Sequence, residues 1–174
     1  MNDTQSFENY PAWMVSIAVL HNFLIYGLGI YILSRVGILW TIPYVLYCLW
    51  IEFRVLKHSC KDCYYYSKLC CLGRSKLAPL FFKKGDPRNF WIKETSRLSM
   101  LPDFLVPIIP LVVGIILLFV GFSVLQLLLI ILLIILYMGG NAFVRSSLAC
   151  KFCKQREIRC PAEEMFSSKK IGIK

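Results

Sequence analysis

The sequence predicts an all-α membrane protein in which four transmembrane helices form two hairpins, each followed by a cytoplasmic cysteine knuckle. The first observation is composition, because 57% of the 174 residues are hydrophobic and the mean hydropathy is +0.62, above the values of soluble domains. The second is a set of apolar stretches as long as bilayer-spanning helices. The third is a cysteine spacing that occurs twice along the chain.

The first predicted hairpin, residues 1–56, contains apolar stretches at residues 12–33 and 38–56. Each stretch has about the 20 residues that a helix needs to cross a hydrocarbon core of ~30 Å. Residues 34–37, with the sequence Ser-Arg-Val-Gly, suit a tight turn between them. The residues before the first stretch lack the Lys or Arg of a cleavable signal, so this stretch is expected to be a permanent helix.

The second predicted hairpin, residues 100–144, contains the longest apolar run. Residues 104–138 carry no charge, and as one helix they would be about 52 Å long, too long for one bilayer. We therefore expect a break near residues 121–123, with the sequence Gly-Phe-Ser. Prolines are expected in the first turns of the third helix, where a missing N–H is tolerated best: Pro102, Pro107 and Pro110.

The net charge of +10 is concentrated in the loop 57–99 and the tail 145–174. The loop has ten Lys or Arg against three Asp or Glu, and the tail has eight against three. Because cytoplasmic segments of membrane proteins are enriched in Lys and Arg, we expect both segments in the cytoplasm of a multi-pass cell-membrane protein. The expected partners are anionic lipid headgroups and a protein of a membrane complex, and nucleic acid is disfavoured.

The cysteine pattern C-K-x-C-x6-C occurs once in the loop and once in the tail, ninety residues apart. Two cysteines three residues apart can direct both sulfur atoms at one ion, and a reducing cytoplasm disfavours structural disulfides. The pattern therefore predicts bound metal or thiol chemistry. The candidate metal ligands are Cys60, Cys63, Cys70, Cys150, Cys153 and Cys160.

Several ligand sets fit this pattern. Four thiolates from the two C-x-x-C pairs suit one tetrahedral site, whereas all six cysteines suit two ions with bridging thiolates. Each half resembles the half-motif of the fungal two-zinc, six-cysteine cluster over eleven residues, and this resemblance implies ligand geometry only. Zinc is the favoured ion. The alternatives are a [4Fe–4S] cluster, which the Cys-Pro at residues 160–161 suggests, and a redox-active dithiol.

Two further cysteines and one histidine are not counted among the candidate metal ligands. Cys71 interrupts the repeat and is interpreted as a seventh thiol near the site or a lipidation target. Cys48 lies inside the second span and is expected to pack. His58 precedes the first motif and is expected to be solvated rather than a ligand.

Polar residues inside the spans are expected to face the helix bundle. His21, Asn22 and Gln126 are predicted to form hydrogen bonds between helices. Glu52 and Arg54, at the end of the second span, are predicted to extend toward the membrane surface.

The sequence contains no phosphate-binding loop, no paired-carboxylate acid–base set and no Ser/His/Asp grouping. Catalysis is therefore neither predicted nor excluded. The expected function is an accessory or assembly module at the membrane with a metal bound to its cysteines. The alternative is a membrane redox protein with an iron–sulfur centre or a dithiol.

Overall fold

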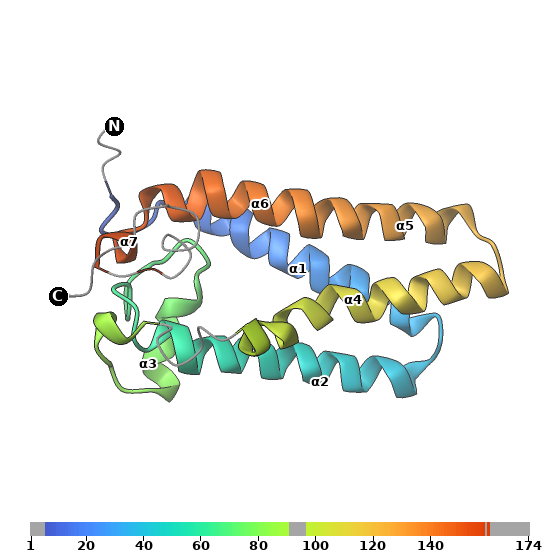
Figure 1. The fold of residues 1–174 in the computed structure, drawn as a ribbon, viewed down its shortest axis with the longest axis horizontal. Helices are drawn as coiled ribbons and strands as arrows, with labels where there is room; N and C mark the ends of the chain where they lie inside the picture. Colours follow the sequence, from blue (N-terminus) through green and yellow to red (C-terminus); the bar gives the residue numbers. More distant parts are fainter. Residues whose placement is uncertain (1–5, 91–96, 159, 161–174) are drawn as a thin grey trace.

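A computed structural model describes residues 6–90, 97–158 and 160, and four long helices dominate it (Figure 1). These are α1 (Ala12–Ser34), α2 (Ile38–Val55), α4 (Arg97–Val120) and α5 (Val124–Ile134). Short helices are α3 (Ala78–Phe81), α6 (Asn141–Phe143) and α7 (Gln155–Ile158), with 3-10 turns at Arg74–Lys76, Pro87–Asn89 and Cys150–Phe152. π-Helical turns occur at Leu56–Cys60, Ile135–Gly140 and Val144–Ala149. The described residues form no β-strand.

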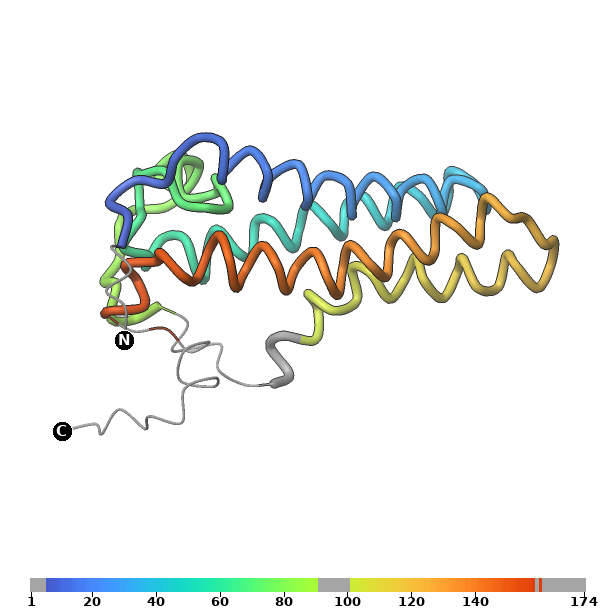
Figure 2. The backbone as a smooth tube through the Cα atoms, turned by 90° about the horizontal axis from the view of Figure 1, so that it is seen from above, coloured from blue at the N-terminus to red at the C-terminus, as the bar shows by residue number. Residues whose placement is uncertain are grey.

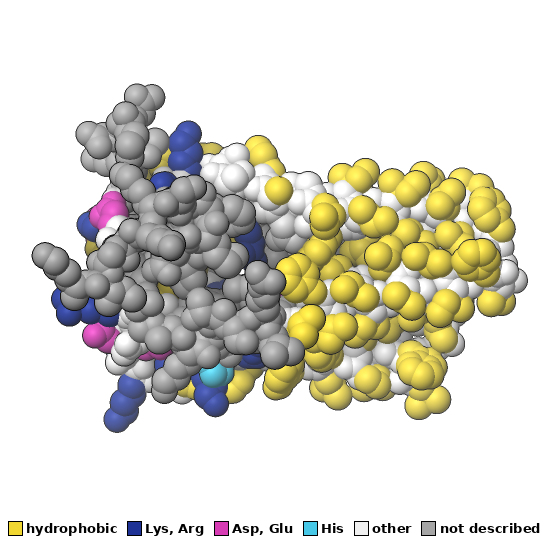
Figure 3. All heavy atoms as spheres, in the orientation of Figure 1, with side chains coloured by type: hydrophobic (Ala, Val, Ile, Leu, Met, Phe, Trp, Pro, Cys, Tyr) yellow, Lys and Arg dark blue, Asp and Glu magenta, His cyan; other side chains and the backbone are white. Residues whose placement is uncertain are grey.

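Among the described residues, four helices are long and apolar enough to cross a membrane, which confirms the prediction of an all-α chain with four candidate spans. They cover Ala12–Ser34, Ile38–Cys60, Leu101–Val120 and Val124–Phe152. Hydrophobic side chains cover most of the visible face of the bundle, and charged side chains gather at one end (Figure 3). An exposed apolar surface of this extent is typical of proteins that contact lipid.

The helix breaks lie where the sequence predicts them. α1 ends at Ser34 and α2 begins at Ile38, with Gly37 between them at a φ of +142°, a conformation that favours glycine. α4 ends at Val120 and α5 begins at Val124. The chain reverses direction at both breaks, so the start of α1, the cysteine-containing loop and the described part of the tail lie at one end of the bundle (Figures 1 and 2).

The prolines of the third long helix lie inside it: Pro102 is in its second turn, and Pro107 and Pro110 are further along. The prediction was wrong for Pro107 and Pro110 because α4 begins at Arg97, before the apolar run from which a span is recognised. Pro110 has no N–H to donate to the carbonyl of Val106, four residues earlier. The hydroxyl of Tyr44 in α2 donates to that carbonyl at 2.9 Å and so satisfies the orphaned acceptor.

Two buried polar side chains in the spans, His21 and Gln126, pack against glycines, and one nitrogen of each lacks a hydrogen bond to the described residues. Hydrogen bonds through their other polar atoms, and through Asn22, stay a prediction. Within the described part of the chain, the Nε2 atoms of His21 and Gln126 have no hydrogen-bond partner. His21 lies directly against Gly140, and Gln126 lies near Gly114. A glycine without a Cβ allows such a close approach between helices.

Candidate functional site

Both copies of the cysteine motif begin at the end of a candidate membrane span. Cys60 is the last residue of the π-helical turn that extends α2. Cys150 directly follows the π-helical turn Val144–Ala149, which extends the fourth span. The two motifs therefore have the same structural position: each begins where a candidate span ends, and both lie at the same end of the bundle.

An N-terminal segment that the sequence did not single out contacts both copies. Phe7 donates its backbone N–H to the carbonyl of Phe152 at 3.1 Å, and it forms an isolated parallel bridge with Cys153. The backbone N–H of Tyr10 donates to the carbonyl of Leu69 at 3.0 Å. Backbone hydrogen bonds thus connect the residues before α1 to the loop and to the tail.

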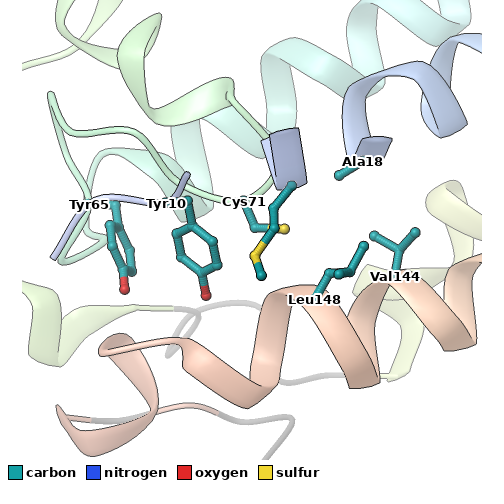
Figure 4. Close-up of a cluster of buried hydrophobic side chains, with 7 residues drawn as sticks. Tyr10, Ala18, Tyr65, Cys71, Val144 and Leu148 are labelled. Carbon is teal, nitrogen blue, oxygen red and sulfur yellow. The ribbon is translucent and has the colours of Figure 1, made fainter. Parts of the chain in front are cut away.

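A buried cluster of side chains packs beside the cysteine motifs (Figure 4). The Tyr65 hydroxyl donates to the Phe7 carbonyl at 2.6 Å and accepts from the backbone N–H of Lys154 at 3.0 Å. Three motif cysteines pack against the cluster: Cys63, Cys70 and Cys153. The cluster contains residues from the N-terminal segment, α1, the loop and the fourth span: Tyr10, Met14, Ala18, Tyr65, Cys71, Val144 and Leu148.

Gln155 and Glu8 connect the tail to the rest of this end of the bundle. The buried Gln155 side chain accepts from the backbone N–H of Tyr64 at 2.7 Å and donates to the Pro87 carbonyl at 2.9 Å. The exposed Glu8 carboxylate accepts hydrogen bonds from Lys154, Tyr64 and Lys68, which lower its pKa to about 2. Glu8 therefore stays ionised at neutral pH and pairs with a lysine from each copy of the motif.

Sequence reasoning missed Glu8, Tyr10, Tyr65 and Gln155 as contributors to the site. One signal was available, because Tyr65 belongs to a run of three tyrosines directly after the first C-K-x-C. Tyrosine combines a large apolar ring with a hydroxyl that finds a hydrogen-bond partner when buried. No comparable pattern marks the other three residues.

Cys63 and Cys70 of the first copy and Cys153 of the second copy pack against the same buried cluster. Burial raises the pKa of the Cys63 thiol, and neighbouring thiols raise it further: Cys70, Cys153 and Cys60. Burial also raises the pKa of Cys153 to about 11, with added effects of Cys160 and Cys150. Cys63 therefore has electrostatic neighbours in both copies.

Among the described residues, no three side chains of His, Cys, Asp or Glu are placed so that they could hold one metal ion together. Three predicted ligands pack against one cluster, whereas Cys60 is buried in another with Leu56 and Ala78, and Cys150 is exposed. The role of all six as ligands stays a prediction. None of the eight cysteines forms a disulfide bond in the described part of the chain. Since buried thiols with a raised pKa are mostly protonated at neutral pH, a metal ion would have to displace their protons.

The two cysteines outside the repeat have distinct surroundings. Cys48 is buried in a cluster with Tyr44 and Val106, in agreement with its predicted packing role. Cys71 is buried beside the motif, and burial, then Cys70 and other nearby thiols, raises its pKa to about 12. Its position favours a further thiol near the site over an accessible lipidation target.

Ion pairs anchor the loop and the helix ends beside the site. The Glu52 carboxylate of α2 accepts from Arg74 of the loop at 2.5 Å and from the Tyr26 hydroxyl of α1. Arg54 forms a salt bridge with Asp103 of α4 at 3.7 Å. Both side chains thus have partners on neighbouring elements, and their extension toward the membrane surface stays a prediction.

Comparison with known proteins identifies no family for this chain. It matches no family model, no curated protein and no solved structure. The function is therefore inferred from the arrangement of its own residues, because an all-helical fold class by itself does not specify function.

Proposed function

We propose that the two cysteine copies hold one shared metal centre, which fastens the cysteine-containing loop to the tail at the membrane surface. The observation that carries the proposal is the position of Cys63, whose neighbours are thiols of its own copy and Cys153 of the other copy. Three thiols leave one position of a tetrahedral zinc site unfilled, so a ligand from the second copy completes the set. The protein then serves as an accessory or assembly module for a partner in a membrane complex.

Zinc is the favoured ion because it accepts four thiolates in a closed structural site. Its positive charge stabilises thiolates that burial otherwise keeps protonated. The same burial, which raises the pKa of Cys63 and Cys153, weakens the alternative of a redox-active dithiol, since reactive dithiols depend on a lowered pKa. An iron–sulfur centre would use the same ligands, so the identity of the metal has to be measured.

Elemental analysis of the full chain, purified in detergent without oxygen, tests the metal proposal. We expect about one zinc ion per chain for a single four-thiolate site, and a colourless sample. A brown sample with stoichiometric iron and sulfide would overturn the zinc assignment in favour of the redox alternative. A metal-free sample that also fails to take up added zinc would overturn the metal centre itself.

We also propose that the cysteine-containing end of the bundle faces the cytoplasm. The second and fourth candidate spans, Ile38–Cys60 and Val124–Phe152, end at this side of the bundle and run into the basic segments 57–99 and 145–174 (Figure 1). Their excess of Lys and Arg follows the charge bias of cytoplasmic segments in membrane proteins. A reducing cytoplasm also keeps thiols available for a metal.

Added cysteines in an otherwise native chain report this orientation. Lys84 and Gly121 are both exposed, at opposite ends of the bundle. In intact cells, we expect a membrane-impermeant maleimide to label the Gly121→Cys variant and to leave Lys84→Cys unlabelled until the membrane is permeabilised. Peptide mapping by mass spectrometry separates the added thiols from the native ones. The reverse labelling pattern would place the cysteine motifs outside the cell.

A further inference from the structure

The loop contains a short segment, residues 76–84, whose apolar side chains point away from the protein although the segment lies outside the candidate spans. Leu77 is 50% exposed, Leu80 is 74% exposed and Phe81 is 59% exposed. In a loop surrounded by water, three neighbouring large apolar side chains at this exposure are unfavourable. Their exposure therefore indicates a surface that is covered in the assembled membrane protein.

The segment is held firmly against the end of the second span. Ala78, in α3, is fully buried and packs against Leu56 and Cys60. The Tyr66 hydroxyl donates to the carbonyl of Phe82 at 2.7 Å. These contacts fix the direction of α3, so that the exposed side of the segment is set by the fold.

The exposed apolar side of the segment continues the lipid-facing surface of α2. The ring centroid of Phe53 lies 5.9 Å from that of Phe81 and 5.3 Å from that of Phe82. Phe53 is itself 45% exposed and belongs to the second candidate span. One turn earlier on α2, the exposed Trp50 has the side chain that is enriched at the membrane–water interface. Phe81 is therefore at the depth where α2 leaves the hydrocarbon.

Lysines flank this apolar surface on both sides. Lys76 precedes it, Lys83 and Lys84 follow it, and all three are exposed. They form no ion pair with any other described residue. Long lysine side chains beside interfacial apolar residues reach the lipid phosphates, and each such lysine near an anionic leaflet adds to binding.

We propose that residues 76–84 form a membrane-interface anchor, in which Leu77, Leu80 and Phe81 enter the bilayer beside α2 and the flanking lysines bind anionic phospholipid headgroups. The anchor holds the cysteine-containing loop against the membrane, which places the candidate metal centre at the level of the headgroups. The continuity with Phe53 favours the bilayer as the occupant over a protein partner. The inference rests on the membrane-spanning part of the proposed function and is independent of the metal.

Tryptophan fluorescence tests the apolar contact. We expect the signal that Leu80→Trp adds to the native protein, in lipid nanodiscs, to be quenched by brominated phospholipids and shielded from aqueous acrylamide. Ser67→Trp, at an exposed position of the same loop, is the matched control and should show the opposite pattern. Acrylamide quenching of Leu80→Trp without bromine quenching would overturn the proposal.

Lipid selectivity tests the lysines. In nanodiscs with a mixture of phosphatidylserine and phosphatidylcholine, we expect the K76Q/K83Q/K84Q variant to lose about threefold or more of the native enrichment of phosphatidylserine around the protein. The K61Q/K68Q/K151Q variant loses the same net charge away from the anchor and should keep that enrichment. Equal losses in both variants would show a general charge effect and would contradict a local headgroup site.

Zinc content, measured on the same samples, separates the two proposals. Native zinc content in the K76Q/K83Q/K84Q variant, together with lost selectivity, would support the anchor independently of the metal. Native lipid selectivity in a metal-free sample would leave the anchor in place even if the metal centre failed. Membrane insertion is tested separately by extraction of the full chain from membranes. An inserted protein is extracted by detergent but not by alkaline carbonate.

Discussion

If the proposed shared site exists, we expect Cys63→Ser or Cys153→Ser to lower the bound metal about tenfold after dialysis against a chelator, because each change removes one ligand. Cys63 lies beside thiols of both copies, and Cys153 is its neighbour from the other copy. The double variant C63S/C153S should therefore lose little more metal than the worse single variant. Elemental analysis of the native chain, both single variants and the double variant measures this effect.

Cys48→Ala is the matched control for this series. Cys48 is buried in the separate cluster around Tyr44 and Val106, so its removal should leave the metal content at the native level. Circular dichroism in detergent checks that each variant keeps its helices. Loss of half the metal in each single variant and of all of it in the double variant would indicate two independent sites. Full occupancy in both single variants would refute a metal role for these cysteines.

We expect a single methyl group at Gly29 to destabilise the helix bundle by about 3 kcal/mol, through overpacking and a lost buried hydrogen bond. A Cβ at this position would overlap the Tyr44 hydroxyl oxygen and lie 2.9 Å from Cζ of the ring. The Tyr44 ring is buried, and its hydroxyl donates to the Val106 carbonyl, which has no helical partner because residue 110 is proline. If the ring moves away, that carbonyl remains unsatisfied inside the membrane. Unfolding of the Gly29→Ala variant by sodium dodecyl sulfate in mixed micelles measures the loss.

Gly27→Ala is the control, because a Cβ at position 27 meets no atom within 4 Å. It should leave stability unchanged or raise it slightly through better helix propensity. A double-mutant cycle with Tyr44→Phe isolates the contact: without the hydroxyl, the added methyl at position 29 should cost clearly less than in the native background. Equal costs of Gly29→Ala in both backgrounds would contradict the role assigned to the Tyr44 hydroxyl.

Much of the helical framework could be predicted from the sequence because hydropathy is a local property. The apolar stretches at residues 12–33 and 38–56 correspond closely to α1 and α2. The break between α4 and α5 lies at the predicted residues 121–123, since one helix cannot span twice the thickness of a bilayer. The start of α4 was mistaken because a helix does not have to begin where its apolar run begins.

The partners of individual polar groups could not be predicted in the same way. Glu52 binds Arg74 and Tyr26, which belong to two different elements. His21 has no hydrogen-bond partner at Nε2 among the described residues, although a buried polar group in a span normally has one. Both outcomes depend on which helix faces surround the side chain, and a sequence pattern gives the type of a residue but not its neighbours.

The sequence by itself determined that the apolar stretches are long enough for four transmembrane helices. It also determined that basic charge is concentrated in two segments and that the spacing of six cysteines is repeated. Only the tertiary structure decided that thiols ninety residues apart become neighbours, and that the residues around Phe7 and Tyr10 join the loop to the tail. The physical reason is that the hydropathy and charge of one segment determine its own preference for the bilayer or for water, whatever the other segments do. The meeting of Cys63 and Cys153, by contrast, depends on how the helices pack and on buried hydrogen bonds between segments distant in the chain.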